Sequence, residues 1–139
     1  MSDYEDSTPR AVSAVQEEMD AALLGVEEAL KRMDEAGEIK RGRESFSTFC
    51  GDSDTPDWQD YTAQSTIFFS TSPADHIQET EKQIVSIASE HGFKSRTQMP
   101  SGSDQHFWEF SNEYGDRISV YVHQDEVHIG GITPCFSPG

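Results

Sequence analysis

The segment "RISVYVHQDEVHIGG", residues 117–131, constrains the fold most, because its apolar side chains recur at every second position. Ile118, Val120 and Val122 share one parity, and alternate residues of a β-strand point to the same face of a sheet. The valine and isoleucine that follow the central acids continue this pattern. We therefore predict a hairpin with one buried face and one polar face.

Other segments have the β-branched and aromatic content of strands. They are "YTAQSTIFFST", "FKSRTQM" and "QHFWEFS", with a short strand at "SFSTFC" inside an otherwise irregular connection over residues 38–60. Trp108 and Phe110 can face the same core as Ile118 only if the loop around Gly115 holds an odd number of residues. A three-residue loop with a bulge satisfies this condition.

The first forty residues carry the signature of a long helix. Thr8 can cap it, Pro9 suits the first helical position, and Gly37 is a good terminator. A stripe of apolar residues recurs between them at helical spacing. We expect this stripe to pack on the sheet, and a dimerising seam is the alternative because the spacing nearly fits a heptad.

A second helix is predicted over residues 72–93. Ser72 and Asp75 form a capping pattern around Pro73 at its start. Gly92 is the predicted left-handed residue at its end, and Phe93 can make the hydrophobic contact behind it.

These elements predict an α+β, two-layer sandwich: an antiparallel sheet of about four to five strands, with the long N-terminal helix and the second helix packed on one face. Residues 1–7 are expected to be a flexible acidic leader, and residues 8–139 a single domain.

The charge of the chain limits its partners. The net charge is −16, from 26 acids against 10 bases, whereas nucleic-acid binding needs a basic footprint. No apolar run approaches the ~20 residues of a membrane span, and no signal peptide is visible at the N-terminus. We expect a monomer or weak dimer without nucleic acid and without a membrane span of its own, and with a protein or envelope partner that the sequence does not identify.

The two cysteines, Cys50 and Cys135, do not form a CxxC motif. They are either two buried thiols or one long-range disulfide, and we favour the disulfide because Cys135 lies so near the C-terminus. A bridge that closes such a long loop stabilises a protein by ~4–5 kcal/mol in the loop-entropy estimate. It would imply an oxidising compartment.

His123 and His128 are the only metal candidates that the sequence offers. If Asp125 and Glu126 form a two-residue turn, the two histidines lie opposite one another on the polar face of the hairpin. A zinc site needs three or four ligands, and residues in a tight turn cannot easily fold back to supply them. We therefore predict an exposed polar pair and no metal, with a metal clamp as the alternative.

Motifs of catalysis and cofactor binding are missing from the sequence. It has no Gly-rich phosphate loop, no G-x-S-x-G and no H-E-x-x-H. Asp104, His106 and Glu109 lie close in sequence, but His106 is expected to be a half-buried strand residue beside Trp108. The glycines of "GGITP" lie inside a strand pattern, where a bulge or a close backbone approach is expected. We expect neither an enzyme nor a cofactor.

Residues 44–139 resemble small secreted proteins and lipoproteins of actinobacteria, including mycobacterial types. The resemblance lies in a cysteine trailed by Trp58, a strand that ends at Ser-Pro, a helix that ends in "HGF", and the ending "HIGGITPCFSPG". The residues that match the closing motif of those proteins are Gly131, Thr133, Cys135, Pro138 and Gly139. The resemblance implies that the upstream cysteine pairs with the last one. It also implies a place in the cell envelope, with a lipid anchor in a longer form.

Two functions follow as hypotheses. The first is a secreted or envelope-associated domain that binds a partner without catalysis. The second is an acidic cytoplasmic partner protein, such as an immunity protein or an inhibitor of a basic protein, because a field of this sign steers basic partners.

Overall fold

A computed structural model of the protein describes residues 9–33, 40–68, 77–98, 105–123 and 125–138. Within these ranges the chain forms α1 (Val12–Met33), β1 (Lys40–Phe49), β2 (Gln59–Phe68), α2 (Ile77–Glu90), β3 (Ser95–Gln98), β4 (Gln105–Ser111), β5 (Arg117–His123) and β6 (Glu126–Ile132). Neither of the described helices is both long and apolar enough to cross a membrane.

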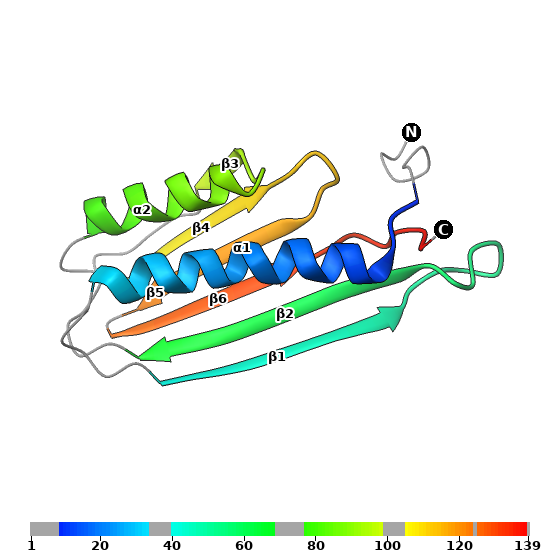
Figure 1. The fold of residues 1–139 in the computed structure, drawn as a ribbon, viewed down its shortest axis with the longest axis horizontal. Helices are drawn as coiled ribbons and strands as arrows, with labels where there is room; N and C mark the ends of the chain where they lie inside the picture. Colours follow the sequence, from blue (N-terminus) through cyan, green and yellow to red (C-terminus); the bar gives the residue numbers. More distant parts are fainter. Residues whose placement is uncertain (1–8, 34–39, 69–76, 99–104, 124, 139) are drawn as a thin grey trace.

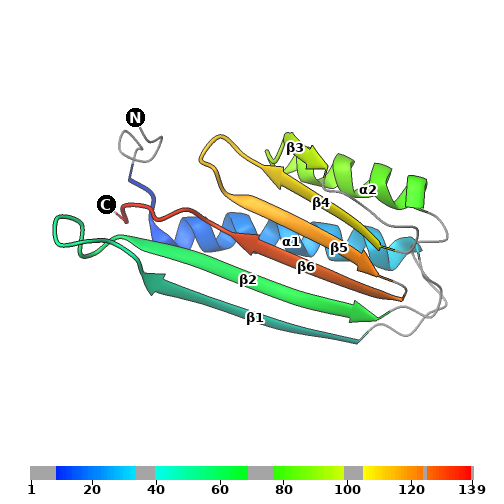
Figure 2. The same cartoon turned by 180° about the vertical axis from the view of Figure 1, so that it is seen from behind.

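The strands form one antiparallel sheet in the order β1-β2-β6-β5-β4-β3. Figure 1 shows α1 and α2 in front of this sheet, and Figure 2 shows the sheet from behind, with both helices on its far side. The predicted α+β two-layer sandwich is confirmed. The predicted number of about four to five strands is too low, because the described residues form six.

The additional strand length lies in β1. The sequence predicted only a short strand at "SFSTFC", whereas β1 pairs with β2 over ten residues, from Lys40↔Phe68 to Phe49↔Gln59. Apolar alternation arises where one face of a strand is buried. In β1 the side chains of Phe46 and Phe49, which lie on opposite faces, are 50% and 73% exposed. Because neither face of the strand is buried at these positions, apolar and polar residues are not expected to alternate along it.

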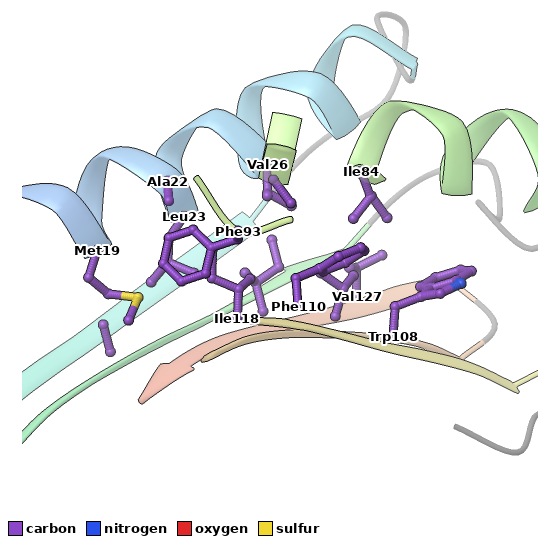
Figure 3. Packing of buried hydrophobic residues seen from close by; sticks show 14 of the residues in the cluster. Met19, Ala22, Leu23, Val26, Ile84, Phe93, Trp108, Phe110, Ile118 and Val127 are labelled. Atoms are coloured by element: carbon purple, nitrogen blue, oxygen red, sulfur yellow. The ribbon is translucent and has the colours of Figure 1, made fainter. Parts of the chain in front are cut away.

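The core lies between the helices and the sheet (Figure 3). The predicted stripe of α1 provides one side of it, through Val15, Met19, Ala22, Leu23, Val26 and Leu30. The sheet provides the other side, through residues that include Trp108, Phe110, Ile118, Val120, Val122, Val127 and Ile129. The stripe therefore packs within the monomer, as the first alternative predicted.

Helix α1 begins three residues later than predicted. Thr8 lies outside the described residues, and Pro9 and Arg10 precede the helix. The backbone N–H of Arg10 donates to the carbonyl of Ser137 at 2.9 Å. This bond ties the segment before the helix to the C-terminal segment.

The end of α2 matches its prediction, whereas its capping residues Ser72, Pro73 and Asp75 lie outside the described residues. Gly92 has a φ of 88°, which only glycine adopts freely. The N–H of Phe93 donates to the carbonyl of Ala88 at 2.8 Å and that of Gly92 to Ser89 at 3.0 Å. These two bonds form a Schellman motif, and the buried Phe93 supplies its hydrophobic contact.

The loop between β4 and β5 has three residues, 113–115, because the N–H of Asn112 donates to the carbonyl of Asp116 at 3.1 Å, one step beyond the pair Ser111–Arg117. The N–H of Gly115 donates to the carbonyl of Asn112 at 3.2 Å, and Gly115 has a φ of 83°, so the predicted three-residue loop is confirmed. The side-chain oxygen of Asn112 also accepts from the N–H groups of Tyr114 and Asp116, both at 3.0 Å. Asp116, directly after the loop, is buried.

Arg10 binds this loop. Its two Nη atoms lie 2.7 and 2.9 Å from the two carboxylate oxygens of Asp116, and the side chains are only 10% and 5% exposed. The guanidinium also lies over the rings of Tyr114, at 4.4 Å, and Phe136, at 5.0 Å. One side chain therefore joins the segment before α1, the β4–β5 loop and the C-terminal segment.

Gly131 allows α1 to lie close to β6. A Cβ at this position would clash with Sδ of Met19 and would lie 3.3 Å from a methyl of Leu23. The close backbone approach predicted for the "GGITP" segment is confirmed here. Gly130, its neighbour, belongs to the other face of the sheet, where a Cβ would meet Oγ of Ser119 at 3.2 Å.

We expect Gly131→Ala to lower the free energy of unfolding by about 1–3 kcal/mol, because the added methyl overpacks the contact with Met19. Gly130→Ala is the matched control and should cost less, since its methyl points away from the core. Urea denaturation measures both. Adding Met19→Ala should recover part of the loss in Gly131→Ala, and equal effects of the two glycine substitutions would contradict this account.

Arg10→Ala is expected to cost about 3–5 kcal/mol of stability, because it leaves the buried Asp116 carboxylate without its cationic partner, with the side-chain amide of Asn112 still donating to it at 3.0 Å. Arg117→Ala is the control: this guanidinium is half exposed and lies 3.8 Å from Glu109, so it should cost less than about 1 kcal/mol. Adding Asp116→Asn to Arg10→Ala should restore stability. Chemical denaturation that finds the two arginines equivalent would refute the role given to Arg10.

Candidate functional site

The ending "GGITPCFSPG" fastens the last segment of the chain. Thr133 donates its N–H to the carbonyl of Tyr61 at 3.0 Å, and its hydroxyl oxygen accepts from the N–H of Tyr61 at 2.9 Å. Phe136 and Gln59 exchange two backbone bonds of 2.8 and 2.9 Å. Cys135 forms a disulfide with Cys50, with Cα atoms 5.9 Å apart. The closing motif therefore has a structural role: it holds the segment after β6 against the start of β2.

The histidine pair has a different register from the predicted one. In the hairpin, Tyr121 lies opposite His128, and His123 lies opposite Glu126. The predicted turn and the pairing of His123 with His128 are therefore wrong, because Glu126 belongs to β6. The predicted face is right: both histidines lie on the face that the helices leave open. The Tyr121 ring lies 6.2 Å from His123 and 6.0 Å from His128, between centroids.

His128 is held by polar neighbours on this face. Its Nδ1 lies 3.1 Å from the hydroxyl of Thr66, and its Nε2 lies 3.4 Å from a carboxylate oxygen of Glu126. Among the described residues, no group of three or more histidines, cysteines or acids is arranged to hold a metal ion. His128 thus forms hydrogen bonds on the open face, while His123 lies beside the ring of Tyr121.

The other candidate residues from the sequence analysis do not form a common site in the described structure. His106 shares the inner face with Trp108 and stacks on it, with ring centroids 6.0 Å apart, as predicted for a half-buried strand residue. Glu109 lies on the opposite face, paired with Ser119. Asp104 lies outside the described residues. The structure thus does not assemble an acid–base site from His106 and Glu109.

Like the pair of Arg10 and Asp116, a polar contact at Glu81 was missed by the sequence analysis. The indole N–H of Trp108 donates to Glu81 at 2.9 Å, and Arg96 forms an ion pair with the other carboxylate oxygen, also at 2.9 Å. Partial burial alone would raise the pKa of Glu81, but the hydrogen bonds from Trp108 and Arg96 outweigh it and lower the pKa below its usual value. No local motif signals this contact, since its members lie on α2, β3 and β4.

The open face of the sheet is the candidate functional site (Figure 2). One row of cross-strand neighbours runs over it through Phe107, Tyr121, His128 and Thr66. The rings of Phe107 and Tyr121 meet edge to face, with centroids 6.2 Å apart. A second row contains Ile132, Thr62 and Phe46.

Within the described part of the chain, neither helix covers this face. Large apolar side chains are exposed there: Phe46, Phe68 and Ile132. Aromatic edges, imidazoles and a carboxylate thus lie together in contact with water. Such a surface can bury apolar area against a partner and form hydrogen bonds with it.

Comparisons with known proteins give a fold. No protein-family model matches the chain, and no curated protein matches it. The chain is similar to the crystal structure of a DUF4853 family protein from Actinomyces odontolyticus, with a TM-score of 0.60 and 11% identity over 99% of this chain and 73% of that one. It is also similar to the putative lipoprotein LppA from Mycobacterium tuberculosis, with a TM-score of 0.53 and 10% identity over 87% of this chain and 76% of that one.

At these identities the likeness concerns the fold alone. The chain shares its fold with these two actinobacterial proteins, in agreement with the resemblance in the sequence.

Glu81→Gln should lower stability at neutral pH and have little effect in acid. A carboxylate whose folded pKa is depressed stabilises the fold above its unfolded pKa, and this contribution is lost as the pH falls through the folded pKa. The difference between wild type and variant in urea denaturation should therefore shrink below about pH 4. Glu79→Gln, two residues earlier in α2, is the control, and a pH-independent difference for Glu81→Gln would contradict the ion-pair account.

Proposed function

We propose that this chain is a non-enzymatic binding domain that acts outside the cytoplasm, in the cell envelope or as a secreted protein. Its fold is shared with the putative lipoprotein LppA from M. tuberculosis. The disulfide between Cys50 and Cys135 supports an oxidising compartment, because such bonds are rare in the cytosol.

The observation that carries the binding role is the uncovered face of the sheet. A surface with several exposed large apolar side chains is costly in water unless a partner covers it. Here Phe46 and Ile132 both flank Thr62, and Tyr121 lies between Phe107 and His128 in the neighbouring row. Aromatic residues of this kind are enriched where protein interfaces concentrate their binding energy.

The open face can be tested by photo-cross-linking in cells. A photoreactive amino acid at Gln64, which is exposed on this face, should give cross-linked adducts of defined mass. The same amino acid at Glu28, exposed on α1, is the control and should give few. We expect the yield at Gln64 to be several times higher, because the partner covers only one side of the sandwich. Equal yields, or none at either position, would argue against a partner on this face.

The compartment can be tested by counting thiols under denaturing conditions in protein from its natural source. We expect no free thiol without reductant and two after reduction. Two free thiols in the native preparation would favour the alternative, an acidic cytoplasmic partner of a basic protein. That alternative also requires a basic protein to co-purify at low salt and to dissociate as salt screens the charge of −16.

A further inference from the structure

The outer edge of β1 is the longest unpaired edge in the described part of the sheet. β1 is the first strand in the sheet order, and β2 is its only neighbour there. The opposite edge is β3, which has four residues, whereas β1 has ten. An edge strand presents a row of free backbone N–H and C=O groups, which can pair with another strand.

Several devices that normally block such an edge are absent from β1. The strand contains no proline, and its pairing with β2 runs through ten consecutive residue pairs without a bulge. Short strands, prolines and bulges are the usual ways to prevent strand addition. What β1 does carry is charge, and the pattern of this charge indicates which strand it can accept.

The two halves of β1 differ in chemistry. Lys40, Arg41 and Arg43 fall within its first four positions, in a chain that has only ten basic residues against 26 acids. The second half carries the exposed Phe46 and Phe49. These two rings belong to opposite faces of the strand, because Phe46 pairs with Thr62 and Phe49 with Gln59.

We propose that β1 binds an extended acidic segment of a partner protein by antiparallel strand addition. Main-chain hydrogen bonds would supply the affinity, and side chains on alternate faces the specificity. The strand positions of Lys40, Arg41 and Arg43 call for acids at the paired positions of the partner strand, and the exposed Phe46 and Phe49 call for apolar residues. This inference deepens the binding function proposed above and rests on it.

A second copy of this chain fits the edge less well. It would bring a further net charge of −16, which opposes association of two copies. Its own β1 would also place no acid opposite the three cations in a symmetric antiparallel pair centred on Ser45. An acidic strand neutralises these cations directly, and directly opposed unlike charges stabilise strand pairs.

The probe is a synthetic peptide as long as β1, with valine and threonine in its N-terminal half and glutamates at the C-terminal positions that oppose Lys40, Arg41 and Arg43. Fluorescence anisotropy with the oxidised, full chain measures its binding. Replacing the glutamates with lysines should weaken binding at least about tenfold. Methylating alternate backbone nitrogens should abolish binding for one set of positions and spare it for the other, because only one set faces β1.

Two double variants with the same change of charge distinguish binding of the peptide at β1 from long-range attraction between the peptide and any positive charge of the chain. Arg41→Glu/Arg43→Glu should weaken peptide binding by about tenfold or more, whereas Lys31→Glu/Arg32→Glu, at the end of α1, should change it much less. Amide hydrogen exchange of the wild-type chain gives a readout that needs no variant: the peptide should protect amides of β1 and leave those of β5 unchanged.

Absence of binding, equal binding of the lysine peptide, or equal losses in both variants would overturn the proposal. So would protection that appears only in a dimer of the chain in sedimentation experiments. If the peptide does not bind at β1 while a residue at position 64 still cross-links to a partner, the proposed binding function stands without an acidic strand as its partner. If both fail, the proposed function falls as well.

Discussion

The burial of one face of the β5–β6 hairpin under α1 is the interaction on which the rest of this structure depends. Gly131 lets Met19 and Leu23 reach the sheet backbone, and Val120, Val122, Val127 and Ile129 complete the core beneath the helices. Because both described helices lie on that side, the other side of the sheet faces solvent. The same arrangement places β1 at the sheet edge, where two of its aromatic side chains remain exposed.

Apolar alternation predicts the faces of strands better than their register. The hairpin pairs His128 with Tyr121 and not with His123, a shift of two residues along β5. Such a shift leaves every side chain on its face, whereas a shift of one would turn the valines to solvent. Burial therefore fixes the parity of the pairing, and the turn decides among the registers that remain. Apolar alternation did not predict the length of β1, because the burial of one face that produces such alternation is missing there.

The polar contacts were the least predictable part of the molecule. Arg10 and Asp116 lie 106 positions apart in sequence, and each looks locally like an ordinary residue beside a helix start or within a turn. Glu81 and Trp108 lie 27 positions apart and share no motif. By contrast, the disulfide that the sequence favoured joins the only two cysteines in the chain. The contacts of rare residue types, and of apolar residues that recur periodically, can thus be predicted from the sequence. The partners of common charged residues are set only by the fold.

The bond between Arg10 and Ser137 has a consequence for how the domain is presented. It holds the segment before α1 beside the C-terminal segment, at one end of the sandwich. From there α1 runs 22 residues toward the opposite end, a length of about 33 Å. The end of β5, the start of β6 and the start of β1 lie at that far end. A domain attached through its N-terminal segment would therefore act as a rigid spacer, and would hold these features about one bilayer core's thickness from the point of attachment.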